Sequence, residues 1–412
     1  MYSISHAVSF SNRIDWVIDN GILVTAFMLP ISLNAASVAL GMTALFWVGK
    51  MIAQGQIGIR QSPFDFRIMA FVLWSGLSML YSPDREGSFY NYYHLMGRYI
   101  LLYYLVISNV NSLSQVRRLI WAVLLSAAVV SVYGFYQYFF SGLDVTATGW
   151  IDGEQFPDIK VRIFSTLQNP NLLAGFLVTV MAVASGIGLY TPGRRRRLLL
   201  FGLAGVLGVC LLLTYSRGAW LSALAVLGVC GMIYNRRLLW LVLFLPVLAL
   251  LAHDAVSERL LSIMNPVDTS CSLRLAVWES TVAMIMDHPL TGVGWGAYQL
   301  VYPSYDFFVL NQATTIYHAH NMYLHLAAET GLPGLAAFLS IMVGHIRLAL
   351  SSFRQARDKR TRGMMLGILA AFAGIAVSGM TDYVMYNVQI AMLFWLLNAV
   401  VISAQPGNRA GA

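Results

Sequence analysis

The sequence predicts an all-α polytopic integral membrane protein, with about twelve transmembrane helices in a single domain covering residues 1–412. Of the residues, 58% are hydrophobic and only 11% are charged, whereas a soluble domain carries about a quarter charged residues. Apolar stretches of about 20 residues, the length that crosses a ~30 Å hydrocarbon core, follow one another along the chain. This composition excludes a soluble globular protein.

Apolar runs separated by helix breakers define the predicted spans. They cover residues 16–34, 36–53, 64–81, 94–109, 117–140, 170–190, 197–214, 217–234, 237–253, 329–349, 363–381 and 385–403. The first fifteen residues are polar and contain no recognisable cleavable signal, so we expect the first span to act as a signal anchor. Two connections are long, residues 141–169 and 254–328, and no linker separates soluble domains.

The distribution of basic residues predicts the orientation. With the N-terminus in the cytoplasm, seven of the 26 Lys and Arg residues fall on the outer side: Arg85, Arg98, Lys160, Arg162, Arg217, Arg259 and Arg274. The rest lie in inner segments, which is the positive-inside pattern. We therefore expect both termini inside and both long loops outside.

Charge and cysteine content exclude two further classes. The net charge is +8, but the basic residues occupy short loops where they orient spans and contact lipid headgroups. No basic and aromatic patch on a soluble domain suggests nucleic-acid binding. Cys210 and Cys230 lie inside predicted spans and Cys271 stands alone in a loop, so no disulfide framework is expected.

An outer arginine between two apolar spans needs an explanation. Arg217 lies in the turn Thr214–Gly218, where the orientation rule disfavours a positive charge and burial in lipid is costly. It either extends to lipid headgroups or provides a fixed cation for an anionic ligand.

The loop 254–328 is predicted to contain a helix on the membrane surface. Leu273, Val277, Val282, Trp278 and Met284 give it an apolar side, Arg274 lies within it, and Pro289 ends it. The following Gly292, Gly294 and Gly296 are spaced as in a dinucleotide-binding turn. They lack a preceding strand and a βαβ unit, so we interpret them as a tight turn.

Three histidines lie close together at the end of this loop, namely His318, His320 and His325. A histidine at the membrane edge can act as a general base, because its ordinary pKa is about 6.5. A transition-metal site is an alternative, but no matching carboxylate or thiolate stands beside the histidines in the sequence. Plain interfacial histidines are the third reading.

The first long loop ends in a polar segment, Arg162–Asn171, that opens a span. Asn169 and Asn171 flank Pro170, which predicts a helix-entry cap, although their amides are also suited to sugar hydroxyls or phosphate. Upstream, Asp152 and Glu154, with Asp158 nearby, form either a solvated acidic loop or a pair able to hold a divalent metal.

Taken together, these segments resemble the O-antigen ligase family. The matching segments, in the family's order, are Arg162–Asn171, Ser216–Gly218, the Arg274/Trp278 helix with its tail Pro289–Gly294, and His320-Asn321 followed by Gly331 and Gly334. The resemblance covers residues 160–340, whereas the first five spans match only in hydropathy. No single motif is specific, and the evidence is the ordered set.

The resemblance implies a GT-C-like glycosyltransferase of the bacterial inner membrane that uses neither metal nor cofactor. Such an enzyme moves a polysaccharide from undecaprenyl diphosphate to a terminal sugar of lipid A–core, with inversion, at the periplasmic face. His320 would be the base, and Arg217 and Arg274 would bind the diphosphate, because arginine forks match phosphate oxygens. Substrate-binding positions would be Arg162, Asn169, Asn171, Ser216, Trp278, His318, Asn321, His325 and Asp382. Asp382 would orient an arginine or the histidine, or would be merely interfacial.

Other functions remain open at this stage. An O-antigen polymerase uses the same donor, but polymerases tend to carry arginine-rich outer loops, and the two long loops here hold only Lys160, Arg162, Arg259 and Arg274 as basic residues. A protein O-oligosaccharyltransferase is a third candidate. A transporter is a different class, disfavoured because the spans carry almost no ionisable residues near their centres.

Overall fold

The computed structural model describes residues 2–141, 161–252, 269–308 and 315–405, together with 257, 258 and 261. Several predicted features lie outside these residues, namely the acidic group Asp152, Glu154 and Asp158 and the basic residues Lys160 and Arg259. Among the residues that the structure describes, the regular elements are all helical.

Within the described residues, each of the twelve predicted spans overlaps a helix. These helices are α1 (Tyr2–Met28), α2 (Leu33–Gln54), α3 (Asp65–Ser78), α4 (Arg85–Asn109), α5 (Leu113–Phe140), α6 (Pro170–Tyr190), α7 (Arg194–Leu212), α8 (Arg217–Ile233), α9 (Leu239–Ala252), α13 (Met322–Gln355), α14 (Lys359–Thr381) and α15 (Val388–Ser403). Within the described residues, five are long and apolar enough to cross a membrane, α2, α5, α6, α13 and α14, and α8 and α15 are shorter apolar helices. The protein is therefore a polytopic, helical membrane protein.

The centre of the bundle is built on close contact between α6 and α14. Gly363 and Gly367 stand one turn apart on α14 and meet Gly186 of α6, where a Cβ would overlap the backbone of Gly367. Small residues at this spacing allow helix backbones to approach closely, which supports helix association in a membrane. This contact joins the N-terminal part of α14 to the C-terminal part of α6. The two helices run antiparallel, so the C-terminal part of α14 lies beside the N-terminal part of α6, where Gly374 meets Val178.

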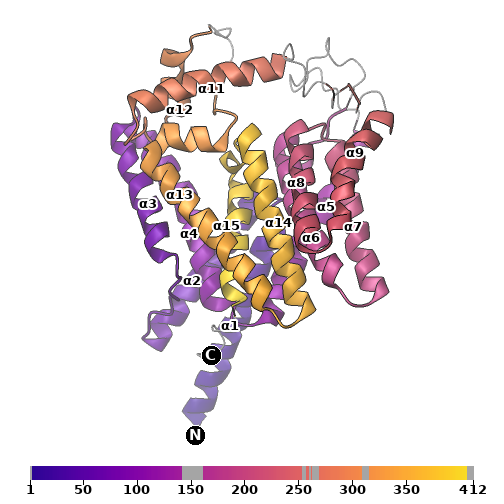
Figure 1. Ribbon diagram of the computed structural model, residues 1–412. Coiled ribbons are helices and arrows are strands. Elements are labelled where there is room, and N and C mark those ends of the chain that lie inside the picture. The colour runs from indigo at the N-terminus through magenta and orange to yellow at the C-terminus, as the bar shows by residue number, and fades with distance from the viewer. Residues whose placement is uncertain are drawn as a thin grey trace.

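The helix α11 (Thr269–Asp287) lies across one end of the bundle, with the short helix α12 (Tyr298–Val301) beside it (Figure 1). Its burial pattern is amphipathic, because Val277 and Met284 are fully buried while Leu275 is exposed. The predicted helix is confirmed, but the assignment of Val282 to its apolar side is wrong. Val282 is exposed because it follows Val277 by five residues, about 140° round a helix.

The helix α13 begins at Met322, seven residues before the predicted span, and is broken inside. Asn321 caps it by accepting hydrogen bonds from the backbone N–H groups of Tyr323 and Leu324. At Gly331 the backbone has φ 69° and ψ 175°, which is not helical. This conformation is essentially restricted to glycine.

The predicted tight turn satisfies the backbone groups that this break exposes. The N–H of Val293 donates to the carbonyl of Ala328, and the N–H of Gly294 donates to that of Glu329. In an unbroken helix the Glu329 carbonyl would face Pro333, which has no N–H to give. Gly292, Gly294 and Gly296 all have positive φ, so the tight-turn interpretation is confirmed.

The two ends of the bundle differ. One carries α11, α12 and the break in α13, and the other carries the start of α1 and the connections α6–α7 and α13–α14 (Figure 1). We call the first the α11 end and the second the opposite end.

Candidate active site

The site begins with a histidine and a carboxylate from distant parts of the chain. His320 Nδ1 lies 3.3 Å from Asp382 Oδ1, and the two side chains are 29% and 15% exposed. His320 precedes the cap of α13 and Asp382 follows the last residue of α14. With Nδ1 donating to the carboxylate, the imidazole is the tautomer in which Nε2 is free to accept a proton.

A chain of hydrogen bonds continues from Asp382 to the first long loop. Asn171 Nδ2 donates to Asp382 Oδ2 at 3.0 Å, and Asn171 Oδ1 accepts from Arg162 Nη2 at 2.7 Å. Arg162 Nε in turn donates to the carbonyl of Thr214 at 2.6 Å. Three of the motifs found in the sequence are thus connected through buried and partly buried polar groups, and Arg162 is held by the protein itself.

The turn that contains Arg217 packs against the same end of α14. Arg217 is the first residue of α8 and is buried, and Ser216, also buried, stands at the N-cap without a side-chain capping bond. Gly218 contacts Thr381, the residue before Asp382, so closely that a Cβ would collide with the Thr381 hydroxyl. The start of α8 therefore lies beside Asp382.

Arg274, on α11, is a further charged residue near Asp382. Its charge lies close enough to Asp382 and His318 to affect the pKa of both groups. Arg274 Nε and Trp278 Nε1 are both buried and make no hydrogen bond within the described part of the chain. Unsatisfied buried donors are rare and need an explanation, of which a ligand is one.

Charge and burial set the protonation states around Asp382. Burial alone would raise the pKa of the Asp382 carboxyl, but the hydrogen bond from His320 and the charges of His320, His318 and Arg274 hold it well below its ordinary value. Burial lowers the pKa of His318 to about 3, even though Asp382 acts in the other direction. At neutral pH the site therefore combines an ionised carboxylate with a neutral His318.

The same residues form a group with the spacing of a metal site. Ligand atoms of His318, His320 and Asp382 all lie within 4.8 Å of one another. The sequence offered no carboxylate that could be matched with His318 and His320, and the fold brings Asp382, 62 residues after His320, beside them. The geometry would accept a transition metal.

Other predicted substrate-binding residues have partners within the protein. Asn169 caps α6 by accepting from the N–H groups of Asn171 and Leu172, so the predicted cap is confirmed. Asn321 Nδ2 donates to the carbonyl of Met380. His325 is almost fully buried, 3.3 Å from Glu329, and accepts from the N–H of Ala319.

Strained backbone gathers in these motifs. The non-glycine residues with positive φ, among those described, are Ser165, Gln168, Tyr215 and His320. Each belongs to one of the three segments joined through Arg162, Asn171 and Asp382. Such conformations are disfavoured by about 1–3 kcal/mol each and concentrate at functional sites.

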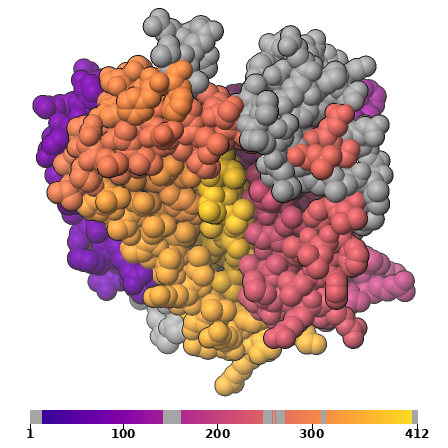
Figure 2. Space-filling model, turned by 45° about the horizontal axis from the view of Figure 1, so that its top comes forward, coloured from indigo at the N-terminus to yellow at the C-terminus, as the bar shows by residue number. Residues whose placement is uncertain are grey.

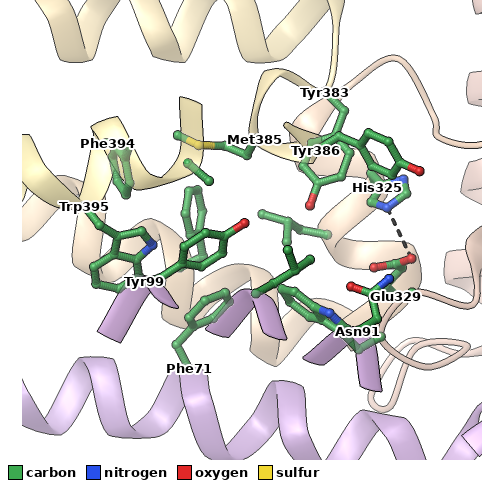
Figure 3. Close-up of a pocket in the computed structure, with 16 residues that line it drawn as sticks. Phe71, Asn91, Tyr99, His325, Glu329, Tyr383, Met385, Tyr386, Phe394 and Trp395 are labelled. Atoms are coloured by element: carbon green, nitrogen blue, oxygen red, sulfur yellow. Dashed lines mark ion pairs between the residues drawn. The ribbon is translucent and has the colours of Figure 1, made fainter. Parts of the chain in front are cut away.

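A cavity of about 270 Å³ lies next to the histidines and was not foreseen from the sequence (Figure 3). One end is polar, with Asn91, Glu329, Tyr383 and Tyr386, and the other is aromatic. The ring of Tyr386 lies 5.1 Å from that of His318. The hydroxyl of the buried Tyr383 makes no hydrogen bond to any described residue, so it is available to a ligand.

Only part of this cavity left a signal in the sequence. Glu329, Tyr383 and Tyr386 lie close in sequence to the histidine motif or to Asp382, so their position in the sequence could have indicated that they belong to the site. Asn91 comes from α4, outside the region of the resemblance, and only the fold brings it there.

From the α11 end, the C-terminal segment reaches the surface between two parts of the molecule (Figure 2). The yellow residues lie between the orange α11–α13 region and the red region of α7–α9.

Comparison with known proteins gives one family. The family model described as O-antigen ligase matches residues 202–339. This region contains Ser216, Arg217, Arg274, Trp278 and the histidine motif, but not Arg162, Asn171 or Asp382. A search of curated proteins finds no match.

Proposed function

Residues 202–339 belong to the O-antigen ligase family, and on that premise we propose that this protein is an O-antigen ligase. The members of this family are glycosyltransferase-like enzymes of the bacterial inner membrane. The proposed reaction transfers a polysaccharide from undecaprenyl diphosphate to a terminal sugar of lipid A–core. The proposed fold is GT-C-like with twelve membrane spans, cytoplasmic termini and the α11 end in the periplasm.

The observation that carries the proposal is the His320–Asp382 pair with Arg274 in electrostatic range. The acceptor hydroxyl attacks the anomeric carbon, while His320 Nε2 takes its proton. The bond from that carbon to the diphosphate oxygen breaks, and the electron pair leaves with the undecaprenyl diphosphate. Attack from the side opposite the leaving group inverts the anomeric carbon.

Arginines would stabilise the charge that develops on the leaving group. Arg274 has an unpartnered buried Nε, and Arg217 lies at the start of α8, where the helix dipole also favours an anion. Arg162 donates to Thr214 and Asn171, so we assign it a positioning role, holding Asn171 against Asp382. Ser216, at the N-cap of α8, and Trp278, whose buried Nε1 has no partner among the described residues, would contact the substrates.

The cavity beside the histidines suits the acceptor sugar. Tyrosine and tryptophan rings pack against the apolar faces of sugars, and their polar groups bond to hydroxyls. The hydroxyl of Tyr383 and the carboxylate of Glu329, both in the lining, would fix the orientation of the ring. We thus propose that the terminal sugar of lipid A–core binds in this cavity, while membrane lipids surround both substrates.

A chelator separates this mechanism from metal-assisted transfer. We propose that His318, His320 and Asp382 work without a metal, because an ion bound to His320 would remove the free base. Transfer by purified protein is expected to continue unchanged in EDTA. Loss of transfer that zinc or magnesium restores would contradict the metal-free mechanism.

The acceptor is tested by reconstitution. Purified protein in liposomes receives undecaprenyl-diphosphate-linked glycan, with lipid A–core in one reaction and only further donor in a parallel one. A ligase extends lipid A–core, whereas growth of the lipid-linked chain itself would identify a polymerase. His320→Ala should lower the rate of product formation by about 10²–10⁴-fold, and His288→Ala, which changes an exposed histidine after α11, is the matched control.

A further inference from the structure

A second cavity, larger than the first, lies at the opposite end of the bundle. It has a volume of about 530 Å³ and is lined by residues of α5, α7, α14 and the α6–α7 connection. Four arginines line it: Arg117, Arg118, Arg196 and Arg360. The positive-inside rule accounts for basic residues at this end, but not for their convergence from three helices on one cavity.

Only part of this positive charge is neutralised by the protein. Arg118 pairs with Asp19 at 2.7 Å, and Arg117 lies within electrostatic range of Asp358. Within the described residues, Arg196 and Arg360 make no ion pair, and both are exposed. Three helices, α5, α7 and α14, also begin here, and helix N-termini attract anions. The cavity is therefore suited to a negative ligand.

Most of the remaining wall is apolar. It includes Ile120, Trp121, Leu199 and Met364. Trp121 is 50% exposed and Leu199 is 70% exposed, so the apolar side opens outward on α5 and α7. A soluble anion would gain nothing from such a wall, whereas a lipid would place its chains along it. Tryptophan is also enriched where membrane meets water.

We propose that this cavity binds an anionic phospholipid, with its phosphate between Arg196 and Arg360 and its acyl chains along α5 and α7. Basic pockets between transmembrane helices bind such headgroups. The site is independent of the proposed transfer reaction, because it lies at the other end of the bundle and shares no lining residue with the cavity beside the histidines.

Native mass spectrometry and thermal unfolding test the proposal. The protein is placed in phosphatidylcholine nanodiscs with or without cardiolipin or phosphatidylglycerol, and inorganic phosphate is added to the neutral discs in a third arm. We expect anionic lipid to remain bound and to raise the unfolding temperature, and inorganic phosphate to do neither. Equal stabilisation by phosphate would overturn the assignment to a lipid.

Variants locate the site. R196Q combined with R360Q should weaken lipid binding about 30-fold, since each basic residue near an anionic headgroup contributes about fivefold. R195Q combined with K359Q is the matched control, because these residues stand on the same helices, are exposed and lie outside the lining. Equal weakening by both pairs would show a diffuse charge effect and overturn the site.

Discussion

The two ends of the bundle use arginine in opposite ways. At the α11 end the arginines are few, and two of them, Arg162 and Arg217, are buried. At the opposite end the arginines are more numerous, and Arg196 and Arg360 are exposed. Exposed basic residues therefore accumulate at one end, while buried arginines and non-glycine residues with positive φ accumulate at the other. The proposed position of the active site thus follows the organisation of polar groups rather than their number.

The largest effect is expected at the base. His320→Ala removes the only proposed proton acceptor in contact with Asp382, and general bases contribute about 10²–10⁴-fold to rate. The rate of transfer to lipid A–core should fall by that factor, with normal membrane insertion. His288→Ala should transfer at the wild-type rate, and retention of activity by His320→Ala would remove the base from the mechanism.

The same conservative substitution at the two ends should differ in effect. Arg274→Lys replaces a planar fork by a point charge, so transfer is expected to fall about 10–100-fold, the range of a charge-assisted hydrogen bond. Arg196→Lys, at the opposite end, keeps the charge and should leave transfer unchanged. The two rates are measured on the same donor, and equal losses would contradict the distinction between the ends.

Backbone geometry can be compared between the ends through two glycines with positive φ. At Gly331 a Cβ would collide with the carbonyl of Leu290, whereas at Gly55, which ends α2, it would meet open space. Gly331→Ala should therefore lower the free energy of unfolding by about 3 kcal/mol, and Gly55→Ala by about 1 kcal/mol. Unfolding in detergent measures both, and similar losses would mean that the break in α13 is not constrained by the glycine turn.

The helices were predictable because apolar runs of membrane length leave few alternatives. Each predicted span overlaps a helix, and the cap at Asn169 and the turn at Gly292–Gly296 follow from local backbone chemistry. The start of α13 was misjudged because the residues after Asn321 mix histidine and tyrosine with apolar residues. These polar side chains made the stretch resemble a loop, so the prediction began the span later. The helix in fact starts after Asn321, which caps it.

The site was predictable only as a set of residue types. Asp382 was recognised as a residue able to orient a histidine or an arginine, but its bonds to both His320 and Asn171 depend on how α14 packs on α6. Likewise, Arg162 has the charge of a phosphate ligand, and only the fold shows its donors engaged by Thr214 and Asn171. Residues that are far apart in the chain form no motif of fixed spacing, so their contact cannot be detected from the sequence.

A small effect is expected from the ion pair of the opposite end. Arg118 and Asp19 are 2.7 Å apart, but the arginine side chain is 51% exposed. Pairs of this kind stabilise a protein by about 0–1 kcal/mol. Arg118→Gln should therefore change the free energy of unfolding by no more than this, and less at high salt. A larger loss would mean that this end, too, depends on specific polar contacts.

The smallest effect concerns His318, which lies at the α11 end yet should not titrate there. Burial lowers its pKa to about 3, so the imidazole is neutral throughout pH 5–8 and gains a proton only as the pH falls through that value. In His318→Gln, the dependence of the transfer rate on pH between 5 and 8 should keep the wild-type midpoint, whatever the maximal rate of the variant. Measured with His320 and Asp382 intact, a displaced acidic limb would show that His318 carries a proton during turnover, and the histidine cluster would then work as a coupled unit rather than through one base.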